Sequence, residues 1–467
     1  MKPGLILLFL TAGIALISAA NSTIQSMAPN TWLSVPNTKM RPLCPSEASC
    51  AGISAIEGCG AVVWSWSGGA FDTKRNRMIV WGGGHSAYMG NEMYAFDLDN
   101  LTWSRITNPT CPQTQYWDNC QDPLLDGNPA GRHTYDGLAY MENTDGFFAH
   151  GGSLACALGS STRVTWLYNF ATGSWTNKNP GGTKPGQGQA YCLTCAYDPL
   201  TGKVLMRDPY SIYAYNVSTN GWTTLNSFGT NWQDMTSTID TKRRLFFTAG
   251  SGEWFVYDIS ANTNVTGQWS TSGGSAVISS GAPGLAYDPA ADCLVAVANA
   301  TVYVLNMATK SWTVKSAASV VPPAEHHGGT YGRFRYSPAE NAFIFVNSVD
   351  DNVWIYKHTA GAGTSAQKSF TRGIAVEISA FPNPFSSTTQ ISLAGMEKIE
   401  DVRAGIYAVS GEKIKTLSMA DFLKAGDHSF SYVWNGLDAR NRRPAPGLYI
   451  FRTNFRGYVQ TWRLLMQ

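Results

Sequence analysis

Charged side chains are scarce in this sequence. Lysine, arginine, aspartate and glutamate make up 14% of the 467 residues, and 34 basic residues nearly balance 32 acidic ones, for a formal net charge of +2. No run of lysine or arginine stands out. Nucleic acids and anionic membranes attract proteins through clustered positive charge. We therefore expect no nucleic-acid partner.

Long apolar runs are also missing, apart from one at the N-terminus. Residues 1–20 contain Lys2, an apolar run from Leu5 to Ile17 and the small residues Ser18-Ala19-Ala20, a pattern typical of a secretory signal peptide. The run is too short for a membrane span. No cysteine follows the predicted cleavage site, so we expect an exported protein without a lipid anchor.

Cysteines number only nine, but an exported protein is expected to use some of them in disulfides. The odd count leaves at least one thiol unpaired. We expect local bridges among Cys44, Cys50 and Cys59. The loop-like stretch that follows Trp103 is expected to be stapled by Cys111 and Cys120.

Cys192-x-x-Cys195 has the spacing of a metal or redox motif. Residues three apart on a strand face opposite sides of a sheet. This geometry favours packing or disulfide pairing for the two cysteines over metal binding.

Glycine is abundant, at 46 residues, and aromatic residues make up 12% of the chain. The clearest repeat runs from Gly69 to Ile106: a strand and polar turn, a strand ending in Gly82-Gly83-Gly84, a third strand and a short one marked by Trp103. Such a block is one four-stranded antiparallel sheet, and this period is typical of a β-propeller. The double glycine with spaced Tyr and Trp resembles the kelch family, which implies an all-β propeller.

Copies of this block are marked by a tryptophan on the closing strand. These tryptophans are Trp103, Trp175, Trp222, Trp269 and Trp312. A sixth copy, His326 to Lys357, lacks its closing strand, and residues 30–35 have the right pattern to supply it. Lending that strand to the last blade would close the ring and bury both sheet edges. We therefore predict a kelch-like propeller over residues 28–358 with six blades. The alternative is a seventh blade between Trp103 and Arg132, a stretch without strand alternation.

The tail is predicted to be a separate domain. Residues 359–374 form a small, polar linker, and residues 375–467 alternate as the strands of a small β-sandwich. Its motifs are Pro382-Asn383-Pro384-Phe385, Tyr407-x-x-Ser410-Gly411, Ala425-Gly426-x-His428 and Pro446-Gly447-Leu448-Tyr449. They resemble the C-terminal sorting domain of the Bacteroidetes-type secretion system, which is similar to the immunoglobulin-like domain of flagellar hook-capping proteins. The resemblance implies outer-membrane secretion machinery as a partner and a secreted or cell-surface protein. The alternative is a generic adhesive sandwich.

Polar residues are predicted to gather at one rim of the ring. The start of a blade's first strand and the end of its second lie on one face beside the central channel, the usual ligand side. Residues expected there are His85, Arg132, His133, His150, Tyr191, Arg207, Asp208, His326 and His327. Five of the seven histidines thus fall on four consecutive blades. Glycoside hydrolysis usually needs two facing carboxyls, and the candidates, Asp208 and Glu325, are far apart in the ring order.

Histidine, tyrosine and arginine suit β-elimination on a uronate. Arginine neutralises the carboxylate, and histidine and tyrosine act as base and acid. The pattern resembles the propeller lyases that cleave ulvan, which carry a histidine pair on one blade and a Tyr and an Arg on the next, on a ring usually described with seven blades. The resemblance implies His133 as base and Tyr191 as acid, or the reverse. It also implies Arg207, helped by His150, as the neutralising pair. Further substrate contacts are predicted from His85, Tyr88, Arg132, His326, His327 and Arg333.

Two alternatives to the lyase remain. One is a propeller that binds carbohydrate without catalysis, stacking sugars on Trp64, Trp66, Tyr88 and Tyr135. The other is a copper oxidase of the galactose oxidase type, for which His85, His326-His327 and Tyr331 are candidates. No convincing Tyr-His dipeptide or partner cysteine supports the oxidase. We expect a monomer that acts on an anionic polysaccharide and requires no cofactor. A structural divalent metal is compatible with any of these alternatives.

Overall fold

The computed structural model describes residues 21–186, 193–228, 233–318, 320–326, 329–360, 377–383, 385–394, 402–408, 412–426, 429–455 and 458–467. The chain separates into two compact units, Met1–Gly363 and Thr364–Gln467. The predicted signal peptide and residues 361–374 of the predicted linker lie outside the described residues.

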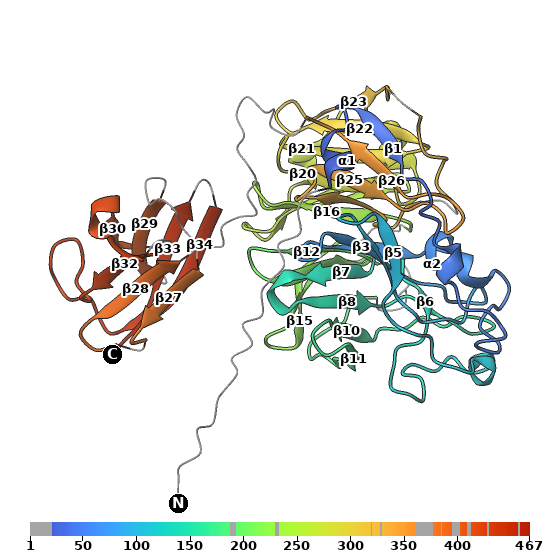
Figure 1. Ribbon diagram of the computed structural model, residues 1–467, viewed down its shortest axis with the longest axis horizontal. Coiled ribbons are helices and arrows are strands. Elements are labelled where there is room, and N and C mark those ends of the chain that lie inside the picture. The colour runs from blue at the N-terminus through green and yellow to red at the C-terminus, as the bar shows by residue number, and fades with distance from the viewer. Residues whose placement is uncertain are drawn as a thin grey trace, which may run out of the picture. The chain divides into compact units, whose positions relative to one another are not determined.

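Four-stranded antiparallel sheets dominate the described part of the first unit (Figure 1). Sheet 1 contains β2 (Gly68–Asp72), β3 (Arg77–Trp81), β4 (Tyr94–Asp97) and β5 (Thr102–Arg105). Sheet 2 contains β7 (Leu138–Met141), β8 (Gly146–His150), β10 (Thr165–Asn169) and β11 (Ser174–Asn177). Sheet 3 contains β12 (Thr194–Asp198), β13 (Lys203–Arg207), β14 (Ser211–Asn216) and β15 (Gly221–Ser227).

Three more sheets of the same kind follow. Sheet 4 contains β16 (Thr236–Asp240), β17 (Leu245–Gly250), β18 (Glu253–Asp258) and β19 (Thr263–Asn264). Sheet 5 contains β20 (Gly284–Asp288), β21 (Cys293–Ala298), β22 (Thr301–Asn306) and β23 (Ser311–Lys315). Sheet 6 contains β24 (Phe334–Ser337), β25 (Ala342–Phe345), β26 (Trp354–Lys357) and β1 (Thr31–Ser34).

The remaining elements of the first unit are short. A two-stranded sheet pairs β6 (Arg132–His133) with β9 (Ser153–Leu154). The helices are α1 (Ser22–Gln25), α2 (Ala61–Trp64) and α3 (Ser275–Ser279), with 3₁₀ turns at Arg41–Leu43, Gly58–Gly60, Thr114–Tyr116, Glu142–Thr144 and Thr266–Trp269. None of the described helices is long and apolar enough to cross a membrane.

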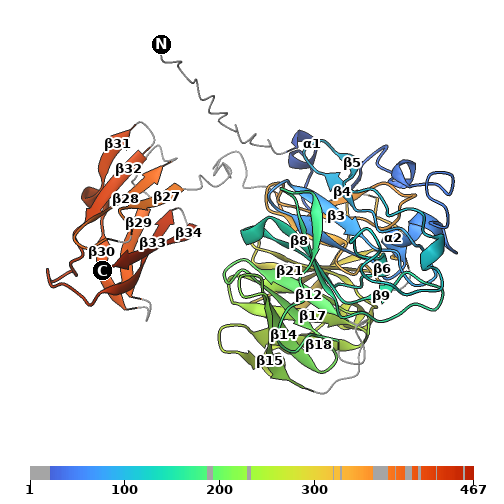
Figure 2. The same ribbon diagram turned by 90° about the horizontal axis from the view of Figure 1, so that it is seen from below.

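The six sheets follow one another in a closed cycle. Their first strands contact in the order β2, β7, β12, β16, β20, β24 and back to β2. Six apolar clusters fill the spaces between consecutive sheets, and the last of them joins sheet 6 to sheet 1. Figure 2 shows the same elements in a second view. The predicted all-β class is confirmed, and the closed cycle is consistent with a β-propeller.

Sheet 6 combines strands from the two ends of the first unit. β1 pairs antiparallel with β26, from Thr31 opposite Lys357 to Ser34 opposite Trp354. The sequence predicted this pairing because the last repeat lacks a closing strand. Trp32 is 4% exposed and packs against four aromatic rings of the sheet. A distant segment of the chain thus closes the cycle.

Aspartates end most of the first strands and fix the turns that follow. Asp72, Asp198, Asp240 and Asp288 each accept a main-chain N–H from a residue two or three positions later. This side-chain bond stabilises a tight turn. These residues belong to the polar turns that recur through the sequence.

The predicted closing tryptophans lie on fourth strands in four sheets, namely Trp103, Trp175, Trp222 and Trp312. Trp269 is the exception, because it follows β19 in a 3₁₀ turn and still packs on Phe247. Between β5 and β6 the structure contains only one 3₁₀ turn, which confirms the predicted loop.

Three disulfides connect the loops of sheets 1 and 2: Cys44–Cys59, Cys50–Cys111 and Cys120–Cys156. The local bridge within residues 44–59 was predicted. The predicted Cys111–Cys120 staple is wrong, because each of these cysteines lies against a segment distant in sequence. Cys195 is a buried free thiol, and Cys192 lies outside the described residues. Three disulfides are typical of an extracellular or secreted protein.

The described residues of the second unit form two four-stranded antiparallel sheets. One contains β27 (Glu377–Phe381), β28 (Thr389–Ala394), β32 (Ser429–Trp434) and β31 (Leu423–Gly426); the other contains β30 (Lys413–Leu417), β29 (Val402–Ala408), β33 (Gly447–Phe455) and β34 (Tyr458–Met466). A 3₁₀ turn spans Met419–Asp421. Both sheets contribute to one apolar core, with Trp434 and Phe451 fully buried.

Candidate functional site

One end of the ring is lined by residues with left-handed backbones. Just before a first strand lie Trp66 (φ 46°), Tyr135 (φ 49°), Asp234 (φ 54°), Ala282 (φ 40°) and Tyr331 (φ 44°). Main-chain bonds join these positions between neighbouring sheets: Tyr135 N–H donates to Trp66 O at 2.7 Å, and Ala282 N–H to Asp234 O at 2.5 Å. We call this end, defined by the five residues, the loop mouth.

Aromatic and imidazole rings form a continuous cluster at the loop mouth. The His133 ring lies 5.2 Å from Trp66, 5.8 Å from His85 and 6.3 Å from Tyr135. Tyr135 in turn lies 5.8 Å from Tyr331. His133 and Tyr331 are buried, whereas Trp66, His85 and Tyr135 are partly exposed. We call these five residues the aromatic cluster.

Short secondary-structure elements and glycines position the cluster. His133 lies on β6, opposite Ser153 of β9, and Trp66 follows α2. Figures 1 and 2 both show α2 and β6 side by side. Side chains at Gly84 and Gly159 would collide with His133 N and the His85 ring, at 2.0 and 2.1 Å. Glycine is therefore required at both positions for the two imidazoles to stack.

Four members of the cluster have strained backbones. Trp66, Tyr135 and Tyr331 are left-handed, and His85 has a φ of 44°. A left-handed conformation costs a residue other than glycine about 1–2 kcal/mol. Such strain persists where the surroundings enforce it and is concentrated at binding and catalytic sites. Left-handed residues also occur in the turns at the other end of the ring, such as Asp145 and Asp292. The meeting of these strained residues with stacked rings makes the loop mouth the strongest candidate site among the described residues.

His150, predicted to help neutralise a substrate carboxylate, is buried between sheets 2 and 3. Its Nδ1 lies 2.7 Å from Thr165 Oγ1, and its ring packs 4.9 Å from Trp222. Burial lowers the pKa of His150 to about 3. The imidazole is therefore neutral at physiological pH, and its predicted role in catalysis stays a prediction.

The burial of His150 predicts an acid-dependent loss of stability. The pKa of about 3 in the folded chain lies below the usual value of about 6.5 in an unfolded chain. The unfolded chain therefore takes up the proton first, and this contribution to stability is complete above pH 6.5 and falls towards pH 3. We expect a His150→Gln variant to lose less stability than the natural protein between pH 6.5 and 4, by about 1 kcal/mol or more.

Urea unfolding at several pH values measures this difference. His326→Gln is the matched control, because His326 is exposed, and it should change with pH as the natural protein does. Parallel pH profiles for the natural protein and His150→Gln would show that His150 is not the group responsible.

The three predicted arginines are engaged inside the protein. Arg132 pairs with Asp122 at 2.9 Å, and Arg207 with Glu253 at 2.8 Å. Arg333 donates to three main-chain carbonyls. Burial lowers the pKa of Arg207 and of Arg333 to about 10. All three are nearly unexposed, and their predicted contacts with substrate stay predictions.

Other predicted contacts are spread over the loops. Tyr88 is buried and donates to Glu92 at 2.6 Å. Burial raises the pKa of that carboxyl. His326 is exposed, packs 5.6 Å from Trp64, and precedes β24 by eight residues rather than opening it. Likewise, Arg132 and His133 lie on β6, which precedes the first strand of sheet 2 and is not part of that sheet.

Tyr191 and His327 lie outside the described residues. The proposed acid therefore stays a prediction.

The interior of the ring holds a buried ion pair that the sequence analysis missed. Asp136 accepts from Arg335 at 2.8 Å, Thr194 at 2.7 Å and Ser237 N–H at 2.8 Å. These residues come from sheets 6, 3 and 4, and Asp136 directly precedes sheet 2. One carboxylate thus joins four sheets. Burial raises its pKa, and Arg335 opposes that shift.

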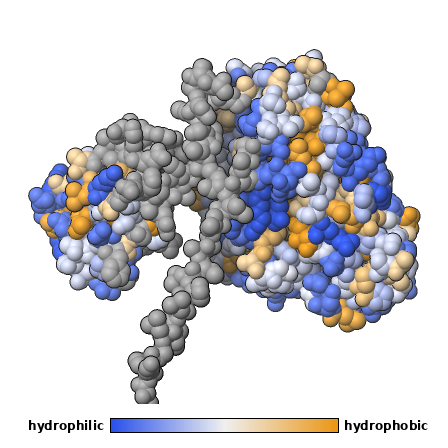
Figure 3. All heavy atoms as spheres, in the orientation of Figure 1, coloured by the Kyte–Doolittle hydropathy of each residue, from blue (hydrophilic) through white to orange (hydrophobic). Residues whose placement is uncertain are grey.

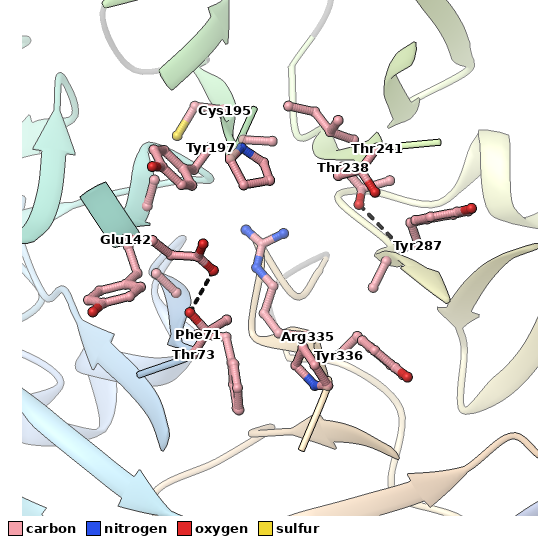
Figure 4. Close-up of a pocket in the computed structure, with 18 of the residues that line it drawn as sticks. Phe71, Thr73, Glu142, Cys195, Tyr197, Thr238, Thr241, Tyr287, Arg335 and Tyr336 are labelled. Atoms are coloured by element: carbon pink, nitrogen blue, oxygen red, sulfur yellow. Dashed lines mark hydrogen bonds between the residues drawn. The ribbon is translucent and has the colours of Figure 1, made fainter. Parts of the chain in front are cut away.

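A cavity of about 320 Å³ lies beyond this ion pair, towards the ends of the first strands. Figure 4 shows Arg335 extending into it. Where sheet 6 has Arg335, the other sheets have Ala70, Ala139, Ala196, Thr238 and Ala286, which leave space for the guanidinium group. The turns that follow the first strands surround this end of the ring, which we call the turn mouth.

No protein-family model and no curated protein matches this sequence. Among solved structures, the chain is similar to an auxiliary nutrient binding protein from Bacteroides thetaiotaomicron, with 11% identity and a TM-score of 0.40 over 63% of this chain and 69% of the other. It is also similar to a chain of a mitotic checkpoint complex, with 8% identity and a TM-score of 0.40 over 77% and 98%. At such TM-scores neither likeness carries an argument about function.

Proposed function

We propose that the first unit is a six-bladed kelch-like β-propeller that binds a uronate-containing polysaccharide at the loop mouth. The observation that supports this proposal is the aromatic cluster. Trp66, His133 and Tyr331 precede sheets 1, 2 and 6, which are neighbours in the closed cycle. Three sheets thus bring their rings together at one end of the channel.

Partly exposed Trp66 and Tyr135 suit the faces of sugar rings, because large rigid aromatics provide contact area at low entropic cost. The two imidazoles add polar groups that hydrogen-bond hydroxyls or attract a carboxylate. Hydrophilic and hydrophobic residues are interspersed over the visible face of the first unit (Figure 3).

We further propose that the second unit is an immunoglobulin-like sorting domain and that the chain is exported as a monomer. The support is the Pro-Asn-Pro-Phe and Pro-Gly-Leu-Tyr motifs together with the N-terminal signal pattern. The three disulfides agree with a route to an oxidising compartment.

Substitution of Trp66 tests the binding site. We expect Trp66→Ala and Tyr135→Ala to weaken binding of the full chain to ulvan or another uronate polysaccharide by at least about 10-fold, because central aromatic contacts dominate recognition. Affinity electrophoresis measures the change. Trp103→Ala, on the outer strand β5 of sheet 1, is the matched control and should bind like the natural protein. Equal weakening by all three variants, or by none, would contradict the proposal.

β-Elimination is the second candidate, and the stacking of His85 on His133 favours it. The rings are inclined by 21°. One imidazole of the pair can serve as the base, and the other can donate a hydrogen bond to the uronate carboxylate. The base would take the C5 proton, the C4–O bond would break as the C4–C5 double bond forms, and an acid would protonate the leaving oxygen.

Ultraviolet absorbance separates elimination from binding alone. The unsaturated uronate absorbs where the substrate does not, so a lyase gives a rise that His133→Ala abolishes and that Trp103→Ala, on the outer strand β5, preserves. A polysaccharide that binds without any rise in absorbance would leave a binding propeller as the function.

A further inference from the structure

Three metal-ligating side chains meet at the turn between β20 and β21 of sheet 5, away from the aromatic cluster. His358 Nδ1 lies 2.9 Å from Asp288 Oδ2 and 3.8 Å from Cys293 Sγ. The three ligand atoms all lie within 4.8 Å of one another, and among the described residues this is the group of histidine, cysteine and carboxylate atoms close enough to hold a metal ion. Asp288 and Cys293 are buried, and the His358 side chain is 11% exposed.

The distances from His358 to the other two ligand atoms are close to those of a tetrahedral site. Metal bonds of about 2.3 Å to sulfur and 2.1 Å to nitrogen and oxygen put sulfur and nitrogen about 3.6 Å apart, and nitrogen and oxygen about 3.4 Å apart. The two distances from His358 Nδ1 differ from these values by about 0.5 Å for Asp288 and about 0.2 Å for Cys293. The fourth position would be available to water.

The groups around the ligands fix their orientation. The other oxygen of Asp288, Oδ1, accepts the main-chain N–H groups of Ala290 and Ala291, at 2.9 and 3.0 Å. Oδ2 is thereby directed to His358. The His358 ring stacks on Tyr356 with an interplanar angle of 19°. Such supporting contacts are typical of metal ligands.

Comparison with the other sheets shows what is unusual about sheet 5. The aspartates that end the first strands of sheets 1, 3 and 4 each pair with an arginine: Asp72 with Arg77, Asp198 with Arg244, and Asp240 with Arg243. The residue directly across from Asp72 is Arg77, and the residue directly across from Asp288 is Cys293. Sheet 5 thus has a thiol and an imidazole where sheet 1 has a permanent cation.

We propose that Asp288, Cys293 and His358 bind a zinc-type divalent cation. A thiolate, a carboxylate and a neutral imidazole carry two negative charges, which the ion neutralises inside the sheet. Oxygen, nitrogen and sulfur together suit zinc rather than calcium or magnesium. On binding, the Cys293 thiol loses its proton to solvent, and the proton of His358 resides on Nε2. Burial raises the pKa of the free thiol to about 12, so the thiolate depends on the cation.

Cobalt titration of the full chain tests the site, because cobalt replaces zinc and reports a bound thiolate by a near-ultraviolet charge-transfer band. Replacing Cys192 and Cys195 with alanine leaves Cys293 as the one cysteine outside the three disulfides. We expect this protein, freed of metal by a chelator, to bind one cobalt ion with that band, and zinc to displace it. Cys293→Ser should remove the band, and His358→Ala should weaken binding by at least about 10-fold.

Absence of a thiolate band in the folded two-alanine protein would overturn the proposal, and this result does not depend on whether the Cys293 variant folds. A band that survives in Cys293→Ser would also overturn it. Neither outcome bears on polysaccharide binding, which the affinity measurement tests separately.

Discussion

Asp136→Ala is expected to lower the free energy of unfolding of the first unit by about 3–5 kcal/mol, because removing one partner of a buried ion pair leaves the other charge uncompensated. Arg335 would lose its 2.8 Å partner, and the Ser237 N–H would lose its acceptor. Asp136 is fully buried, so water cannot take its place without rearrangement. Urea unfolding measures the loss.

A double-mutant cycle isolates the interaction between the two charges. Arg335→Met keeps much of the side-chain volume in the cavity and removes the charge. The double variant Asp136→Ala, Arg335→Met should therefore lose less stability than the sum of the two single variants. Strict additivity, or a loss below about 1 kcal/mol for Asp136→Ala, would show that the ion pair does not hold the sheets together.

Trp32→Ala is expected to cost about 3–5 kcal/mol, the range found when a large buried aromatic is truncated. Trp32 touches Phe334, Phe345, Trp354 and Tyr356, with the nearest ring centroid 4.9 Å away. The lost packing belongs to β1, the strand that closes the cycle. Urea unfolding measures the resulting decrease in the free energy of unfolding. Trp32→Phe is the matched control, because it keeps an aromatic ring in the same cluster.

Limited proteolysis distinguishes local opening from global loss of stability. If β1 closes the cycle, Trp32→Ala should speed cleavage within residues 21–40 before the rest of the first unit is cut. Uniform cleavage throughout the unit, or the same pattern as in Trp32→Phe, would contradict the closing role of β1.

Sequence patterns predicted the sheets well because each sheet is a local unit. The double glycines, polar turns and outer-strand tryptophans recur at a regular period, and the lack of a strand after Lys357 indicated that residues 30–35 would complete sheet 6. The Cys111–Cys120 pairing failed because proximity in sequence does not determine which loops meet at the rim of a ring.

The candidate site could be predicted only in part. Trp66 and Tyr135 were named as sugar-stacking residues, and His85 and His133 were assigned to one face; the structure brings all four together. The left-handed backbone of Tyr331 and its bond to Asp234 were not predicted. A signal was present, since an aromatic residue stands one or two positions before a glycine in Trp66-Ser67-Gly68, Tyr135-Asp136-Gly137 and Tyr331-Gly332.

The residue pattern could not predict the internal contacts of the arginines. A sequence identifies a permanent cation but not its internal partners: Arg132 is held by Asp122 of the preceding loop, and Arg207 by Glu253 of sheet 4. The Asp136–Arg335 pair was missed because its residues are nearly 200 positions apart.

Hydrogen–deuterium exchange of the full chain, with and without a bound uronate polysaccharide, tests the proposed site most directly. Binding at the loop mouth predicts slower amide exchange in residues 64–67, 84–88, 132–136 and 329–333, which contain the aromatic cluster and its neighbours. Exchange in the turns around the cavity, such as residues 73–76, 142–145 and 241–244, should not change. Protection confined to those turns would place the ligand at the turn mouth and contradict the account.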